Sequence, residues 1–169
     1  MHQHDLPTPA AHQPDETDTP ITITATQVGD DDRSSFLPSC FGTVRTGQRQ
    51  LPAYLFAENL IYTRLKQMSE DYHGDFWHFY HLSNGSAYMA PSTLRPMRIK
   101  AENGYQNTVS ADAAGIVVTL AAYSDLLALW DDSSADVDTL AQAVHARFYG
   151  LRDFALAHAE RDAILQLID

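Results

Sequence analysis

The amino-acid sequence predicts an α+β fold in which an antiparallel meander of three or four strands packs against several helices. Two Asn-Gly pairs, at 84–85 and 103–104, each divide a run of alternating residues that is typical of a hairpin. An apolar run at 111–130 has the periodicity of a buried helix, and two further helical patterns follow it. Strands grouped in one part of a chain and helices in another are typical of the α+β class.

Residues 1–33 are predicted to be a disordered acidic leader, ahead of a single folded domain at 34–169. The leader holds four prolines, seven acidic residues and one arginine, and it has few large apolar groups to bury. The alternation in "ITITATQV" is also compatible with a strand. We nevertheless expect the whole leader to lack regular structure.

The domain begins near "SSFLPSCFG" (34–42), where apolar side chains offer anchors and Pro38 with Gly42 is expected to stop regular structure. A helix is then predicted over "LPAYLFAENLIYTRLKQM" (51–68), because apolar residues recur at helical spacing and Pro52 is tolerated in a first turn. The residues expected on its buried face are Leu55, Phe56, Leu60, Ile61, Leu65 and Met68.

The stretch "DFWHFYHLSNGSAYMAP" (75–91) is predicted to form a hairpin that turns at Asn84-Gly85. A two-residue type I′ turn needs positive φ at both positions, which asparagine and glycine accept best, and it would place Tyr80 opposite Met89. Aromatic residues fall on both faces of these strands. We therefore expect helices on one side of the sheet and partial cover on the other.

"RPMRIKAENGYQNTV" (95–109) is predicted to form a second hairpin, which turns at Asn103-Gly104. Arg98 and Lys100 alternate there with apolar residues, so one face should be apolar and the other basic. The two hairpins together supply the strands of the predicted meander.

Three helices are predicted to complete the domain. Ser110 is a suitable N-cap for the apolar helix at 111–130, and Asp112 in its first turn is favourable to the helix dipole. A second helix is predicted from about 137 to 158, and a short one over "RDAILQLI" (161–168) closes the chain.

Acidic residues outnumber basic ones, 22 Asp and Glu against 11 Lys and Arg, for a formal net charge of −11. Such a chain repels nucleic acid on average, because nonspecific binding depends on neutralising phosphates with basic groups. The polar, acidic start is neither a signal nor a transit peptide, and we expect a cytoplasmic monomer with no membrane segment. One cysteine excludes an internal disulfide framework.

No motif for catalysis or metal binding stands out. His73, His78 and His81 lie close in sequence, but a strand points His78 and His81 to opposite faces, so no metal site is expected. The sequence lacks a Gly-x-Ser-x-Gly elbow, a His-Glu-x-x-His motif and a phosphate-binding glycine loop. Cys40 is expected to be packed rather than nucleophilic. We therefore expect a protein that is not an enzyme and uses no cofactor.

Nucleic-acid binding is the main alternative function. The basic strand at 95–100 and exposed aromatic residues of the first hairpin would serve an accessory protein that stacks single-stranded bases. The acidic net charge does not favour direct DNA binding.

Four blocks of sequence, in this order and spacing, resemble the antirestriction proteins of the ArdB/KlcA type. The resemblance covers 36–169 and leaves out the leader. Its blocks are "FLPSCFG", "GDFWHFYHLSNGSAYMAP", "SADAAGIVVTL" and "LRDFALAHAE".

The resemblance implies a small α+β protein, carried on mobile genetic elements such as plasmids, that relieves host type I restriction-modification and so protects incoming DNA. It implies neither catalytic residues nor cofactors. It also implies structural roles for the tight helix contact at 113–115 and for the first turn. The expected partner is the type I restriction endonuclease complex.

We do not expect full imitation of DNA to be the means of inhibition. A site of about 20 base pairs carries on the order of 40 phosphate charges, whereas this chain has 22 acidic residues offset by 11 basic ones. A local acidic patch is still compatible with the sequence, since 125–138 holds five aspartates and no Lys or Arg. We hypothesise that this patch docks on a basic surface of the restriction complex. Its residues are Asp125, Asp131, Asp132, Asp136 and Asp138.

Overall fold

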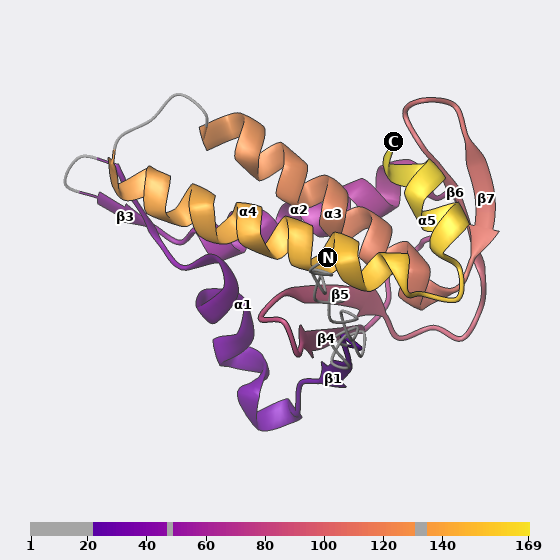
Figure 1. The fold of residues 1–169 in the computed structure, drawn as a ribbon, viewed down its shortest axis with the longest axis horizontal. Coiled ribbons are helices and arrows are strands. Elements are labelled where there is room, and N and C mark those ends of the chain that lie inside the picture. Colours follow the sequence, from indigo (N-terminus) through magenta and orange to yellow (C-terminus); the bar gives the residue numbers. More distant parts are fainter. Residues whose placement is uncertain (1–21, 47–48, 131–134) are drawn as a thin grey trace, which may run out of the picture.

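The computed structural model describes residues 22–46, 49–130 and 135–169, with side chains outside the description at 44–46, 49–51, 130 and 135–139. Its strands pair antiparallel, and the run β4 to β7 is followed by the helices α3 to α5, which fits the predicted α+β class (Figure 1). In chain order they are β1 (Ala25–Gln27), a 3₁₀ turn (Asp30–Asp32), α1 (Arg33–Phe41), β2 (Val44–Thr46), β3 (Arg49–Leu51), α2 (Ala53–Met68), β4 (Trp77–Leu82), β5 (Ala87–Pro91), β6 (Met97–Lys100), β7 (Gln106–Val109), α3 (Ala111–Trp130), α4 (Ala135–Leu156) and α5 (Arg161–Ile168).

The described strands form three separate antiparallel sheets rather than one meander. Their orders are β1-β4-β5, β2-β3 and β6-β7, so the two predicted hairpins do not pair with each other. The reason is that α3 lies on the edge of β5 that β6 would have needed. Tyr123 donates a hydrogen bond to the carbonyl of Ala87 at 2.7 Å, and the amide of Met89 donates to Thr119 Oγ1 at 3.3 Å. A helix thus satisfies backbone groups that an edge strand would leave free.

The three-stranded sheet includes residues from the predicted leader. β1 pairs with β4, with Ala25 opposite Leu82 and Gln27 opposite Tyr80, and α1 begins directly after the 3₁₀ turn. The ordered fold therefore starts before the expected boundary at residue 34. Residues 1–21 of the leader lie outside the described part.

Helix α1 continues through Pro38, where the sequence predicted a stop. It ends at Gly42, whose φ of 57° is accessible to glycine and whose amide donates to the Pro38 carbonyl at 2.9 Å. Phe36 and Phe41 are buried, as expected of anchors, and Phe36 stacks on Phe79 of β4 with ring centroids 4.8 Å apart.

The buried face of α2 also differs from the prediction. It is formed at four-residue spacing by Ala53, Ala57, Ile61 and Leu65, whereas Leu55 and Phe56 are 52% and 51% exposed. The small alanine side chains allow another helix to approach α2 closely. The predicted face differed because it was chosen from the spacing of the larger apolar residues.

The first hairpin has a register one residue away from the predicted one. Tyr80 lies opposite Tyr88 rather than Met89, and a three-residue loop replaces the two-residue turn. Of the described non-glycine residues, none has positive φ, so Asn84 does not adopt the type I′ conformation. Gly85, with φ of 83°, alone takes the left-handed position, which is typical of a type I turn with a bulge.

Both hairpin loops bind a helix through their asparagine. Asn84 Oδ1 accepts from the amide of Ser86 at 3.1 Å, and its Nδ2 donates to the carbonyl of Gly150 in α4 at 2.8 Å. Asn103 repeats this arrangement, with its Nδ2 donating to the carbonyl of Gln166 in α5 at 3.2 Å. The same side chain therefore closes each turn and positions a helix.

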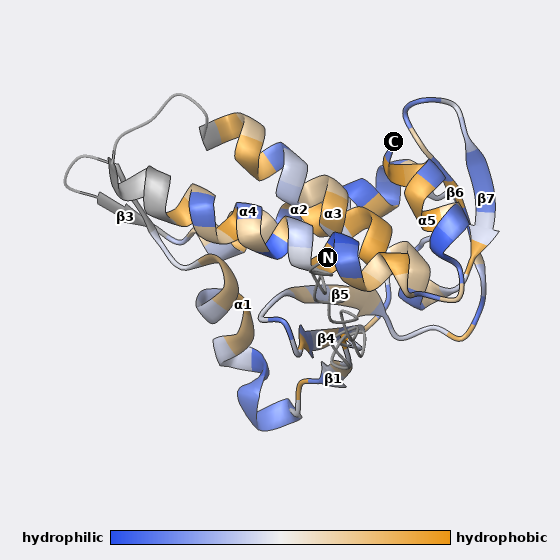
Figure 2. Ribbon diagram, in the orientation of Figure 1, coloured by the Kyte–Doolittle hydropathy of each residue, from blue (hydrophilic) through white to orange (hydrophobic). Residues whose placement is uncertain are grey.

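Helix α3 is the centre of the fold. It contacts α2, α4, α5 and β5, and Figure 2 shows that it is hydrophobic along most of its length. Ser110 caps it as predicted, because its Oγ accepts from the amide of Ala113 at 3.1 Å. Among the described residues α3 is long and apolar enough to cross a membrane, a property it shares with core helices of soluble proteins, and it is mostly buried inside the fold.

Helix α3 touches β5 at Gly115. A Cβ placed there would lie 2.6 Å from both Cα and Cβ of Ala90, closer than van der Waals contact permits. The backbone of a strand cannot yield as the end of a flexible side chain does. The glycine is therefore required by the distance between helix and sheet.

We predict that Gly115→Ala destabilises the protein, because overpacking costs about 1–3 kcal/mol and exceeds the gain in helix propensity of about 1 kcal/mol. Thermal unfolding followed by circular dichroism should show a lower Tm than wild type. Gly29→Ala is the control, since a Cβ at Gly29 meets no atom within 4 Å. An unchanged or raised Tm for Gly115→Ala would contradict the close contact.

Candidate partner-binding site

Of the five aspartates in the predicted contact patch, the structure describes only one side chain. Asp125 lies near the end of α3. Asp131 and Asp132 lie outside the described residues, and Asp136 and Asp138 belong to the start of α4, where side chains are outside the description. The patch as a docking surface therefore stays a prediction.

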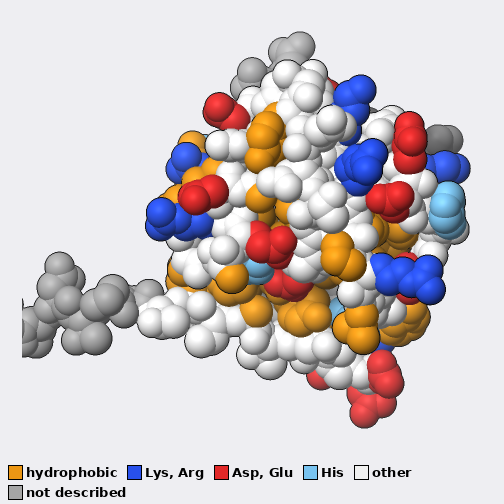
Figure 3. Space-filling view, turned by 90° about the vertical axis from the view of Figure 1, so that its right-hand side faces the viewer, with side chains coloured by type: hydrophobic (Ala, Val, Ile, Leu, Met, Phe, Trp, Pro, Cys, Tyr) orange, Lys and Arg blue, Asp and Glu red, His pale blue; other side chains and the backbone are white. Residues whose placement is uncertain are grey.

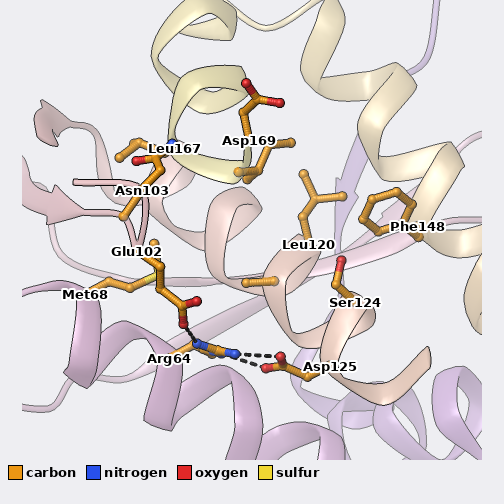
Figure 4. A pocket seen from close by; sticks show the side chains of 13 residues that line it. Arg64, Met68, Glu102, Asn103, Leu120, Ser124, Asp125, Phe148, Leu167 and Asp169 are labelled. Atoms are coloured by element: carbon orange, nitrogen blue, oxygen red, sulfur yellow. Dashed lines mark hydrogen bonds and ion pairs between the residues drawn. The ribbon is translucent and has the colours of Figure 1, made fainter. Parts of the chain in front are cut away.

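Asp125 is held in a bidentate ion pair with Arg64 of α2 (Figure 4). Arg64 Nε donates to Asp125 Oδ2 at 2.6 Å, and Nη2 donates to Oδ1 at 2.5 Å. Nη1 donates to Glu102 Oε1 at 2.5 Å, from the loop between β6 and β7. One guanidinium thus joins two helices and a hairpin in the geometry that favours strong charge-assisted bonds.

These contacts fix the charge of Arg64. Hydrogen bonds to Asp125, opposed by partial burial and reinforced by Glu102, raise the pKa of Arg64 above its already high value. The positive charge of Arg64 thereby balances the negative charge of Asp125. It is less suited to bind a partner than the sequence suggested.

A pocket of about 220 Å³ opens beside this ion pair. Its apolar wall includes Leu120 of α3, Phe148 of α4 and Leu167 of α5, and its rim carries Glu102 and Asp169 (Figure 4). Arg64 is the only Lys or Arg among its lining residues and is already paired twice. The other charged groups at the rim are carboxylates, so the pocket is suited to bind a cationic group rather than an anion.

Charges of both signs are mixed on the face shown in Figure 3, where acidic, basic and apolar side chains alternate over short distances. No continuous acidic row crosses this face.

The second hairpin shows the predicted division into apolar and basic faces. Met97 and Ile99 are buried, whereas Arg98 and Lys100 are exposed. Most rings of the first hairpin serve the core instead, and Phe76 is the one that is exposed above half its surface, at 55%. Because most of these rings are buried, the basic strand and the aromatic groups do not form one continuous binding surface.

The histidines of the first hairpin lie apart. His78 Nδ1 contacts Gln27 Nε2 at 3.1 Å, whereas His81 packs beside Phe36 with ring centroids 4.9 Å apart. Within the described ranges, no three His, Cys, Asp or Glu residues gather in a metal-binding cluster. Cys40 is buried, and burial raises the pKa of its thiol despite the nearby Arg147 guanidinium, which disfavours a nucleophilic thiolate.

A polar network that the sequence did not predict secures the start of α3. Asp112 accepts from Tyr88 at 2.8 Å and contacts His158 Nε2 at 3.1 Å. The amide of Glu160 donates to His158 Nδ1 at 3.0 Å, and the Glu160 carboxylate accepts from the amide and hydroxyl of Ser110. Burial, and then the charge of Asp112, raises the pKa of Tyr88, so its hydroxyl remains a donor. The sequence identified Ser110 and Asp112 as residues at the start of the helix. Their partners lie far along the chain, so no local sequence pattern pointed to these contacts.

Comparison with known proteins identifies the family. The sequence model described as "Antirestriction protein" matches residues 70–169. The antirestriction protein KlcA of Escherichia coli is 42% identical over 151 residues, which cover 89% of this chain and 96% of that protein. The putative antirestriction protein YubI of Escherichia coli K12 is 36% identical over 155 residues, which cover 89% of this chain and 96% of that protein.

A solved structure supports the same relationship. It belongs to a study of KlcA and ArdB that describes a novel fold and antirestriction activity against type I DNA restriction systems in vivo but not in vitro. That structure matches with a TM-score of 0.74 and 36% identity, covering 96% of this chain and 100% of that one. The chain therefore belongs to the antirestriction protein family.

Proposed function

We propose that this protein relieves type I restriction in the cell and so protects incoming DNA of mobile genetic elements such as plasmids. The observation that carries the proposal is the 42% identity to KlcA over nearly the whole of both chains. KlcA and ArdB have antirestriction activity against type I systems in vivo. Restriction acts on DNA inside the host cell, so the proposed site of action is the cytoplasm.

The proposed mechanism is non-enzymatic contact by a monomer with the restriction complex. Several polar groups described above are committed to structure, including Arg64, which pairs with two carboxylates, and Glu160, which accepts from Ser110. Cys40, the single cysteine, is buried. These features support a protein that acts by binding rather than by turnover.

The acidic patch remains the proposed contact, in a reduced form. Asp125 is paired with Arg64, so the contact is assigned to Asp131, Asp132, Asp136 and Asp138. Four carboxylates within eight residues, with no Lys or Arg between them, favour attraction to a basic partner surface.

A second candidate function is nucleic-acid binding by β6. The exposed pair Arg98 and Lys100 on one face favours it, and the net charge of −11 opposes it. Retention on a DNA column that falls steeply with added salt would support this alternative.

We predict that expression of the protein raises the plating efficiency of unmodified phage on cells with a type I restriction system. A restriction-deficient strain is the control, and plating there should not change. Absence of rescue, with folded protein present, would contradict the proposed function.

We predict that reversing the four remaining aspartates to lysine abolishes this rescue while Tm and secondary structure are retained. The reason is that attraction to a basic surface becomes repulsion. The matched control reverses Asp30, Asp31 and Asp32, which are exposed in the 3₁₀ turn. Full rescue by the quadruple variant would show that the patch is not the contact.

Asp125→Asn should lower stability instead, because it weakens a partly buried bidentate pair. Hydrogen bonds to charged groups contribute about 1.5–3 kcal/mol, and the partial exposure of this pair places the loss towards the lower end. Urea unfolding of Asp125→Asn, Arg64→Met and the double variant would measure their coupling. Additive losses would mean that the pair contributes nothing.

A further inference from the structure

We propose that a pocket on the open half of the β1-β4-β5 sheet binds an arginine side chain of a partner protein. The pocket has a volume of about 360 Å³ and lies between the sheet, the loop at 92–94 and the start of α3. If the arginine belongs to the restriction complex, the inference rests on the proposed function and assigns it a second contact.

The pocket exists because α4 covers only part of this sheet face. Tyr88 is buried under Phe154, with ring centroids 5.8 Å apart. Tyr80 stacks on Tyr88 at 4.7 Å, and beyond it His78 continues along the same face of β4 without a covering helix. Phe76 precedes the strand, and its ring is covered by the Arg33 guanidinium of α1 at 4.2 Å from the ring centroid. The open half therefore presents aromatic rings in a row.

The walls are suited to a planar cation. Tyr80 and His78 supply ring surfaces, and Asp112 supplies a carboxylate that is 40% exposed. Its two oxygens accept one hydrogen bond each, from Tyr88 and His158, and a carboxylate oxygen has capacity for another. A guanidinium stacks on aromatic rings while donating to a carboxylate, which an ammonium group does less well.

Charge separates arginine from the other ligands that stack on aromatic rings. No Lys or Arg lines this pocket, and its one carboxylate would repel a phosphate. A nucleotide therefore lacks a partner for its charged part. A positively charged side chain from another protein is favoured by both the pocket and the net charge of −11.

The rim has the composition of a protein interface. Leu94 is 100% exposed and borders the pocket beside Pro91. Apolar side chains around a polar anchor exclude water from it when a partner docks. The loop at 92–94 thus places a large apolar group where the fold itself does not need one.

The first test uses the full chain and a defined probe, Nα-acetyl-arginine N-methylamide, with the uncharged citrulline analogue as its control. NMR titration should show saturable shifts at Tyr80, His78 and Leu94. The citrulline analogue should bind about tenfold more weakly, since its neutral urea keeps N–H donors but loses the positive charge that strengthens the bond to the carboxylate and the stacking on the rings. Equal binding of the two probes, no binding of the arginine probe, or stronger binding of adenosine monophosphate at these residues would overturn the proposal.

The second test measures rescue of unmodified phage by His78→Ala and Leu94→Ser, with Leu55→Ser as the matched control on the distant helix α2. Leu55 is 52% exposed, so the control removes a similar exposed side chain. Loss of at least about tenfold in plating for the pocket variants alone corresponds to one good interface contact. Full rescue by both variants would overturn the contact with the restriction complex.

These outcomes separate the two proposals. Failure of the wild-type protein to rescue overturns the proposed function, and the probe titration still decides the pocket. A concentration-dependent dimer that Leu94→Ser disrupts, measured by sedimentation, would assign the rim to a second copy of this chain and overturn the inference.

Discussion

The contact between α3 and the free edge of β5 is the constraint on which the rest of the fold depends. Gly115, Thr119 and Tyr123 recur at four-residue spacing, so they form one stripe along the helix. The glycine allows backbone contact, and the other two hydrogen-bond to β5. With that edge occupied, the chain cannot add β6 to the sheet and forms a separate ribbon. The buried helix then becomes the surface on which α2, α4 and α5 pack.

The hairpin loops attach the last two helices to this centre. Gly150 lets α4 approach the first loop, since a Cβ there would lie 2.9 Å from that of Ser86 and 3.1 Å from Asn84 Nδ2. A helix interior pays about 1 kcal/mol for a glycine, and here the glycine permits the hydrogen bond between Asn84 and its carbonyl. Turn geometry and helix packing therefore depend on the same few atoms.

Sequence reasoning succeeded where the signal is local. The α+β class, the two hairpins, the cap at Ser110 and the bounds of α5 follow from turn residues, caps and periodicity. It failed where the cause lies far along the chain: β1 is stabilised by β4, more than fifty residues later. In the first hairpin, Asn84 has negative φ and binds α4, and the register differs by one residue from the predicted one. Asp125 was identified as a surface acid because its partner, Arg64, lies 61 residues earlier in a helix with no distinguishing pattern.

The same division between local and distant causes bears on function. The polar groups that the fold pairs internally, such as Arg64 and Glu160, connect elements remote in sequence and are thereby removed from chemistry with a substrate. What the described part of the fold leaves exposed is of another kind: apolar side chains, aromatic rings at a pocket and the acidic turn at Asp30–Asp32. Such groups gain free energy by burial against another surface and by charge complementarity, not by proton transfer. The proposed inhibition by contact therefore relies on surfaces that the core of the protein does not use.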